Sequence, residues 1–114
     1  MNTEKLNITV KTVSDYLAQG AYEELERLSN GVRLTAREIQ TAVESYGRKI
    51  VPLPDEAYGD LDVVEVDGVE PKQWSVNVPV FTVEEGMSDL TLELTVIDSY
   101  SDSYKVEVDD LHVL

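Results

Sequence analysis

The feature that most constrains the fold is an alternation of apolar and polar residues along three runs in the second half of the chain. Apolar side chains occupy every second position over residues 74–80, 90–96 and 104–108. This period is typical of a β-strand that buries one face. Short turns such as Asp67-Gly68 and Glu84-Glu85-Gly86 lie between strand segments. Strands joined without a helix pair antiparallel, because a parallel pair needs a long crossover. We therefore predict an antiparallel sheet with one apolar face.

Two further strands are predicted before these runs. Residues 61–66 are rich in β-branched valine, and residues 49–54 predict a short edge strand. Pro52 and Pro54 restrict the latter to an edge, since proline cannot donate to a ladder. The last strand is predicted to run from residue 104 nearly to the end of the chain, which gives four or five strands.

The first half predicts three amphipathic helices. The first apolar stripe is formed by Leu6, Val10, Val13 and Leu17, with Asn2 or Thr3 as the N-cap. A second, shorter helix covers about residues 21–29. The third begins at the capping box Thr35-Ala36-Arg37-Glu38. A glycine suited to the left-handed position after a helix follows the first and third, at Gly20 and Gly47.

This order of elements defines an α+β fold class. A chain of 114 residues suits one domain, residues 1–114, with a single core. The one-sided sheet needs a cover, and the amphipathic helices supply it. We predict N-terminal helices packed in the concave face of a curved antiparallel sheet. Because the sequence ends with a strand, we expect a complete small protein.

Charge is unevenly placed along the chain, whose formal net charge is −14. Residues 1–49 carry seven basic and seven acidic side chains, whereas residues 50–114 carry two and sixteen. This balance disfavours nucleic acid and an anionic membrane surface as partners, since both attract cations. It suits a cationic protein partner. It equally suits acids whose role is to keep a small domain soluble.

The composition also excludes several kinds of site. The absence of cysteine removes disulfides, thiolate metal sites and cysteine nucleophiles, and a single histidine rules out a histidine-rich zinc site. We therefore expect no metal and no cofactor. Residues 1–11 lack the apolar core of a signal peptide, and no run approaches the ~20 apolar residues of a membrane helix. We expect a cytoplasmic protein.

One segment resembles a known superfamily. The residues Val13-Ser14-Asp15-Tyr16-Leu17-Ala18-Gln19-Gly20-Ala21-Tyr22-Glu23-Glu24-Leu25, followed by a helix and a meander of long strands, resemble the NTF2-like (cystatin-like) superfamily. More closely, the chain resembles a family of small bacterial proteins of unknown function in four blocks: 35–47, 73–80, 84–94 and 108–113. The resemblance covers roughly residues 10–114 and rests on a cap, a turn and alternating strands.

The resemblance implies a fold more than an activity. NTF2-like domains form a cone with an internal pocket, and many dimerise through the outer face of the sheet. The superfamily includes enzymes, ligand binders, dimerisation modules and immunity proteins, so the fold alone selects none of them.

Catalytic members of the superfamily use a pocket carboxylate or histidine with tyrosine partners, which makes Asp62, Glu93 and His112 the catalytic candidates. A carboxylate in an apolar pocket has a raised pKa and can act as a base. Asp62 is expected on the solvent face of an early strand. Alternation sends Glu93 to the face opposite Leu92 and Leu94, which is a solvent or dimer surface.

His112 has two possible orientations. It is the only side chain that ordinarily titrates near neutrality. Simple alternation along the last strand places Asp110 and His112 on the inner face, as a candidate base pair. A bulge near residues 109–110 reverses this and buries Leu111 and Val113. Because burying two apolar residues is more favourable, we predict an exposed His112.

Three aromatic residues are the ligand-binding candidates. Tyr16 and Tyr46 end helical stripes, where a cone would open, and Trp74 begins a strand. Buried Tyr and Trp side chains need a partner for their polar tips. They predict a modest pocket between helices and sheet, with ordinary packing as the alternative.

Three functions are consistent with the sequence. The first is a non-enzymatic binding or dimerisation module, a homodimer with a pocket for a small apolar ligand. The second is an acidic immunity or inhibitor protein that binds a cationic protein through residues 50–114. The third is a small isomerase or dehydratase-like enzyme, which requires a carboxylate or histidine inside the cone beside a tyrosine.

Overall fold

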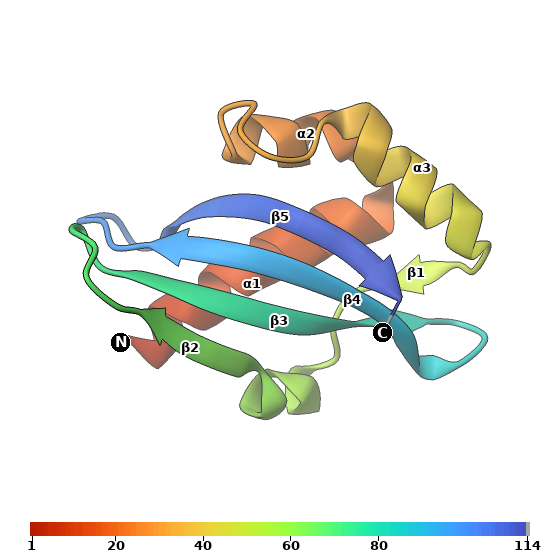
Figure 1. The fold of residues 1–114 in the computed structure, drawn as a ribbon. Helices are drawn as coiled ribbons and strands as arrows, with labels where there is room; N and C mark the ends of the chain where they lie inside the picture. Colours follow the sequence, from red (N-terminus) through yellow and green to blue (C-terminus); the bar gives the residue numbers. More distant parts are fainter. Residues whose placement is uncertain (114) are drawn as a thin grey trace.

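The chain folds as three helices followed by a five-stranded sheet (Figure 1). The computed structural model describes residues 1–113. In chain order the elements are α1 (Thr3–Gln19), α2 (Tyr22–Leu28), α3 (Ala36–Tyr46), β1 (Ile50–Val51), η1 (Asp55–Asp60), β2 (Asp62–Val66), β3 (Gln73–Thr82), β4 (Gly86–Ile97) and β5 (Lys105–Val113). The α+β class and the three helices are confirmed. The 3₁₀ helix η1 was not predicted, because six residues are too few to show a period.

The strands form one open antiparallel sheet. β3 pairs with β4 along one edge, whereas β1 and β2 share its other edge. β5 lies beyond β4 and closes the series. The edge strand predicted over residues 49–54 is reduced to Ile50–Val51, because two prolines follow directly.

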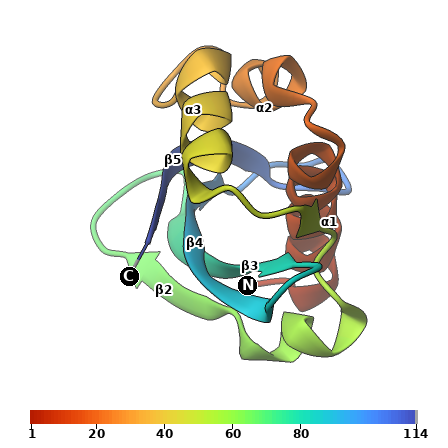
Figure 2. The ribbon, with the colours of Figure 1, turned by 90° about the vertical axis from the view of Figure 1, so that its right-hand side faces the viewer.

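The helices lie on one side of the sheet (Figure 2). α1 crosses its concave side, and α2 and α3 lie beside β5. This arrangement of helices and curved sheet matches the predicted layering. The NTF2-like cone stays a prediction.

The inner face of the sheet and the helix stripes form one core. The four apolar residues predicted on α1 are all buried there: Leu6, Val10, Val13 and Leu17. Trp74 of β3 packs against Tyr104, with ring centroids 5.4 Å apart. Full burial of one valine or leucine side chain contributes about 1.5–3 kcal/mol to the stability of the folded state. The alternation in β3 and β4 is therefore the pattern that builds the core.

Three buried hydroxyls tie the helices to the backbone of the sheet layer. Thr9 accepts a hydrogen bond from the Tyr104 N–H, and Ser29 accepts one from the Val108 N–H, both at 2.8 Å. Ser14 accepts the Leu53 N–H at the same distance. Val108 lies in β5, which has a strand on only one side, and Tyr104 and Leu53 lie just outside strands, so these bonds satisfy donors that no ladder reaches.

Helix ends follow the predicted chemistry. Asn2 caps α1 by accepting the Lys5 N–H. Thr35 and Glu38 form the reciprocal capping box of α3. Gly20 and Gly47 take the left-handed conformation, each with φ of 72°.

The substitution Ser29→Ala tests the role of the buried hydroxyls. It leaves the buried Val108 N–H without its partner, so we expect the free energy of unfolding to fall by about 1–3 kcal/mol. Urea denaturation measures this change. The control is Ser101→Ala, which removes an exposed hydroxyl bonded to the Ser103 carbonyl and should change stability by less than about 0.5 kcal/mol. Equal losses in the two variants would contradict this account.

Candidate functional site

The outer face of the sheet is left uncovered by the described helices (Figure 2). The strand register arranges its side chains in cross-strand rows. From β5 to β2, one of these rows consists of Asp110, Glu93, Asn77 and Asp62. The neighbouring row, on the side where β5 ends, contains His112, Thr91 and Pro79. Two of the three catalytic candidates therefore lie in one row, and the third lies in the adjacent row.

A bulge in β5 determines which side chains reach this face. Val108 pairs with Leu94, but the next pair toward the C-terminus is Asp110 with Glu93, so Asp109 is an extra residue. Such an insertion shifts the alternation of everything that follows it. Asp110 and His112 therefore point outward while Leu111 is buried.

The bulge was one of the two alternatives considered for His112, and the structure contains it. The accompanying prediction that Val113 is buried is wrong, since its side chain is 57% exposed. The physical reason is its position as the last residue of an edge strand, beyond Leu111, the last buried residue of β5.

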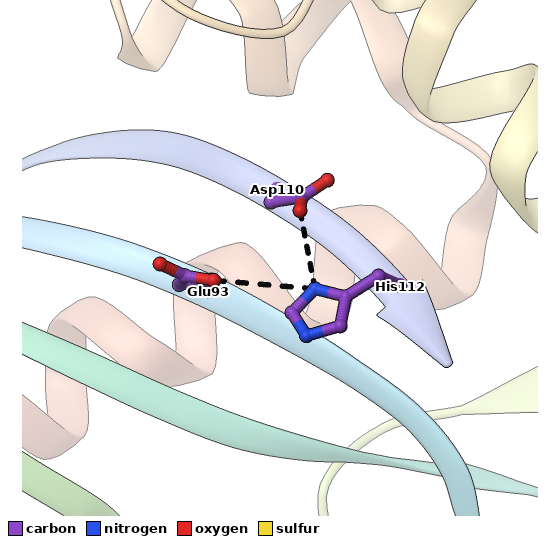
Figure 3. Close-up of side chains that lie close together, drawn as sticks. All are labelled: Glu93, Asp110 and His112. Atoms are coloured by element: carbon purple, nitrogen blue, oxygen red, sulfur yellow. Dashed lines mark ion pairs between the residues drawn. The ribbon is translucent and has the colours of Figure 1, made fainter. Parts of the chain in front are cut away.

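Glu93, Asp110 and His112 converge in space (Figure 3). The imidazole Nδ1 lies 3.2 Å from Asp110 Oδ2 and 3.9 Å from Glu93 Oε2. One donor atom from each residue lies within 4.8 Å of the other two. The side chains are 40%, 53% and 36% exposed, in chain order. The cluster is thus a half-exposed set of two carboxylates and one imidazole held by two paired strands.

The nitrogen at the centre of this cluster lies within ion-pair distance of Asp110 but makes no hydrogen bond of ordinary geometry. His112 Nδ1 is buried, although the ring as a whole is not, and it finds no hydrogen-bond partner within residues 1–113. The nearby Asp110 carboxylate instead accepts the backbone N–H of Leu111 through Oδ1. A nitrogen placed between two carboxylates in this way is suited to contact with a cation.

A second charged group adjoins the cluster along β5. Arg33 reaches across from the α2–α3 connection and lies 3.3 Å from Asp109 and 3.6 Å from Glu107. Asp109 also accepts a hydrogen bond from the Thr95 hydroxyl at 2.5 Å. Arg33 therefore balances the bulge carboxylate, whereas the two carboxylates of the cluster face the histidine.

The catalytic candidates are not inside the helix–sheet layer. Asp62 is exposed on β2, in register with Asn77, and Glu93 and His112 lie on the outer face of β4 and β5. The isomerase hypothesis requires at least one of them beside a tyrosine under the helices, and the structure places none of the three there.

The aromatic ligand candidates have other surroundings. Trp74 is buried against Tyr104. The Tyr46 hydroxyl donates to the Glu85 carboxylate, 2.9 Å away. Tyr16 is partly buried against the core. Four surface hollows are lined by described residues, and none of the four is lined by these three aromatics. Their role in ligand binding stays a prediction.

The cluster itself was only partly predictable. Alternation placed Glu93 outside, and the bulge alternative placed His112 outside. Their approach depends on the β4–β5 register, which no residue pattern specifies to a single position. Arg33 was missed, because nothing in a loop sequence indicates which strand its side chain reaches.

A separate hollow lies between α2 and α3, with Tyr22, Arg37 and Glu44 among its lining residues. Burial raises the pKa of the Tyr22 hydroxyl above its usual value, and the nearby Glu44 carboxylate adds to this effect. Ionisation of this phenol is therefore disfavoured in the folded state.

The raised pKa of Tyr22 predicts a loss of stability in alkali. The unfolded chain releases the phenol proton near pH 10, before the folded chain does, so stability should fall as the pH rises from about 10 through the folded pKa. Tyr22→Phe should remove part of this fall. Urea midpoints measured between neutral and alkaline pH test the prediction, with Tyr100→Phe, at an exposed tyrosine, as the control. Parallel pH profiles for wild type and Tyr22→Phe would contradict it.

Comparison with known proteins adds the family. None of the helices in residues 1–113 is long and apolar enough to cross a membrane. Searches of curated proteins and of solved structures gave no match. The family model described as Domain of unknown function (DUF7668) matches residues 14–114. Since this match covers most of the chain, the protein belongs to the DUF7668 family.

Proposed function

We propose that the chain is a binding module that forms a homodimer through the outer face of its sheet. The observation that carries this proposal is a neutral area on that face, which we call the neutral outer patch. It is made of the β2, β3 and β4 residues of the two rows on the far side of the acidic row from His112; β5 continues these rows with the charged residues Glu107 and Lys105. The residues of the patch are Val64, Val66, Gln73, Ser75, Thr95 and Ile97.

The patch is unusual for this chain. Val64 is 59% exposed and Val66 is 36% exposed, side by side with uncharged polar residues. The chain as a whole carries a net charge of −14. A contiguous uncharged surface with exposed valines on an acidic protein supports an interaction role, because solvated faces are normally charged.

The outer face as a whole, of which the neutral outer patch is one part, is large enough for a second copy of the chain. β3 and β4 have ten and twelve residues. At about 3.3 Å per residue and about 4.8 Å between strands, the whole outer face of β2 to β5, with the acidic row included, presents a flat area of roughly 600 Å². Protruding side chains raise the accessible area toward the ~800 Å² per partner of a standard interface. Self-association also places the least charged part of each copy against the other.

The acidic inhibitor hypothesis has less support. The acids of the second half are spread over several places: η1, the three connections between β2 and β5, and the outer face. Docking of one cationic partner through this half requires a single contiguous acidic surface. The homodimer and inhibitor hypotheses also predict opposite effects of salt on the strength of association.

Val64→Glu tests the dimer interface. A carboxylate in the patch places like charges across the interface, so we expect the dimer dissociation constant to rise at least about tenfold. Sedimentation velocity measures the association. The matched control is Val83→Glu, at a valine of similar exposure (63%) in the β3–β4 turn, which should leave the dimer unchanged. A wild-type chain that stays monomeric at all concentrations would refute the proposal.

Ionic strength provides a second test. Two copies that each carry −14 charges repel, and salt screens this repulsion. We therefore expect dimerisation to strengthen between about 0.05 M and about 0.5 M salt, where the Debye length falls severalfold. Sedimentation equilibrium at several salt concentrations measures this. Weaker association at high salt would instead indicate attraction between opposite charges, as the inhibitor hypothesis requires.

A further inference from the structure

We infer that Glu93, Asp110 and His112 form a binding site for a divalent transition-metal ion of the zinc class. The inference goes beyond the proposed dimer and does not rest on it, because none of the three residues belongs to the neutral outer patch. It rests on the spacing of the donor atoms, on the unpartnered nitrogen and on the chemistry of the donor set.

The donor atoms already have approximately the spacing of a metal centre. Ligands about 2.1 Å from a zinc ion in tetrahedral geometry lie about 3.4 Å from one another. The two distances from His112 Nδ1 to the carboxylate oxygens are 3.2 Å and 3.9 Å. All three donors lie within 4.8 Å of one another. Side-chain movements on the order of 1 Å in the exposed carboxylates close the set around one ion.

The histidine nitrogen is the independent observation that indicates a ligand. Nδ1 has less than 1 Å² of exposed surface and no hydrogen-bond partner within the described part of the chain. Its ring is oriented so that this atom points between the two carboxylates (Figure 3). A nitrogen shielded from water costs free energy unless it is hydrogen-bonded, and the Asp110 carboxylate, 3.2 Å away, does not form a hydrogen bond of ordinary geometry with it. An ion held between Nδ1 and the two oxygens removes that cost.

The scaffold makes the arrangement rigid. Glu93 and Asp110 face each other across the β4–β5 ladder, and His112 is two residues along the same strand. The bulge at Asp109 is what points Asp110 and His112 outward together. Sites built on strands hold their donors more accurately than sites built on loops.

The donor set indicates the class of ion. Calcium and magnesium take oxygen ligands, whereas one imidazole with two carboxylates suits Zn²⁺ and neighbouring transition metals. Three protein ligands leave a fourth position for water or for a group from a partner. The site is open on that side, since all three side chains are partly exposed.

Calorimetric titration of the untagged full chain with ZnCl₂ tests the inference. We expect saturable binding of one ion per chain. Glu93→Gln, Asp110→Asn and His112→Gln each keep approximately the size of the side chain and replace a carboxylate or imidazole ligand with a neutral amide, which binds zinc more weakly. Each should weaken binding by roughly 100-fold or more, because even second-shell changes cost about 10–100-fold. Glu56→Gln, at an exposed carboxylate of η1, is the matched control and should bind as the wild type does.

A second measurement locates the ion independently of affinity. In amide NMR spectra, zinc should shift resonances of residues 91–94 and 109–113 and leave those of η1 unchanged. Circular dichroism confirms that each variant is folded. Excess Mg²⁺ should not displace the zinc.

Three outcomes would overturn the inference. The first is the absence of saturable zinc binding by the wild type. The second is undiminished binding by His112→Gln, which would indicate adventitious attraction to surface acids only. The third is displacement by Mg²⁺ at comparable concentration. A monomeric chain that still binds one zinc ion would refute the dimer and leave the metal site standing.

Discussion

The structure depends on a sheet that buries one face and leaves the other open. The helices cover only the concave side, so every strand residue is assigned either to the core or to the outer face by its parity. The apolar positions of β3 and β4 fill the core, and the remaining positions become the surface. Both the neutral outer patch and the Glu93–Asp110–His112 cluster are products of this division. The net charge of −14 belongs partly to that outer face and partly to the turns and η1 around it.

β5 satisfies two demands that conflict at an edge. On its core side it supplies buried residues, and at its free edge it carries backbone donors and acceptors that no further strand reaches. The Ser29 and Thr9 hydroxyls and the Leu34 N–H, which donates to the Val108 carbonyl, meet this need over the first part of the strand. Beyond Val108, the extra residue Asp109 begins a segment whose outward side chains are ionisable, namely Asp109, Asp110 and His112. The same strand therefore contributes residues both to the core and to the candidate site.

The sequence predicts local features well and tertiary distances poorly. The Thr35 capping box, the Gly20 and Gly47 helix ends and the alternation of Trp74 to Val80 each follow from neighbouring residues alone, and all are present. η1 was missed because it is too short to show a period. Val113 was placed in the core because parity says nothing about where the cover ends. The contact between Glu93 and His112 requires the β4–β5 register, and the NTF2-like cone remains a prediction.

Because of the bulge, the direction of the side chains at the end of β5 depends more on the number of residues in the strand than on their identity. Deleting Asp109 would restore plain alternation across the ladder, and each later side chain would change sides. Asp110 and His112 would then lie beneath α3, and Leu111 would face water. Exchanging one exposed side chain for another changes a single position, but removing this one residue inverts the polarity of the strand end. In this chain, a change in the number of residues between Val108 and Leu111 therefore exchanges the buried and exposed positions of everything that follows in the strand.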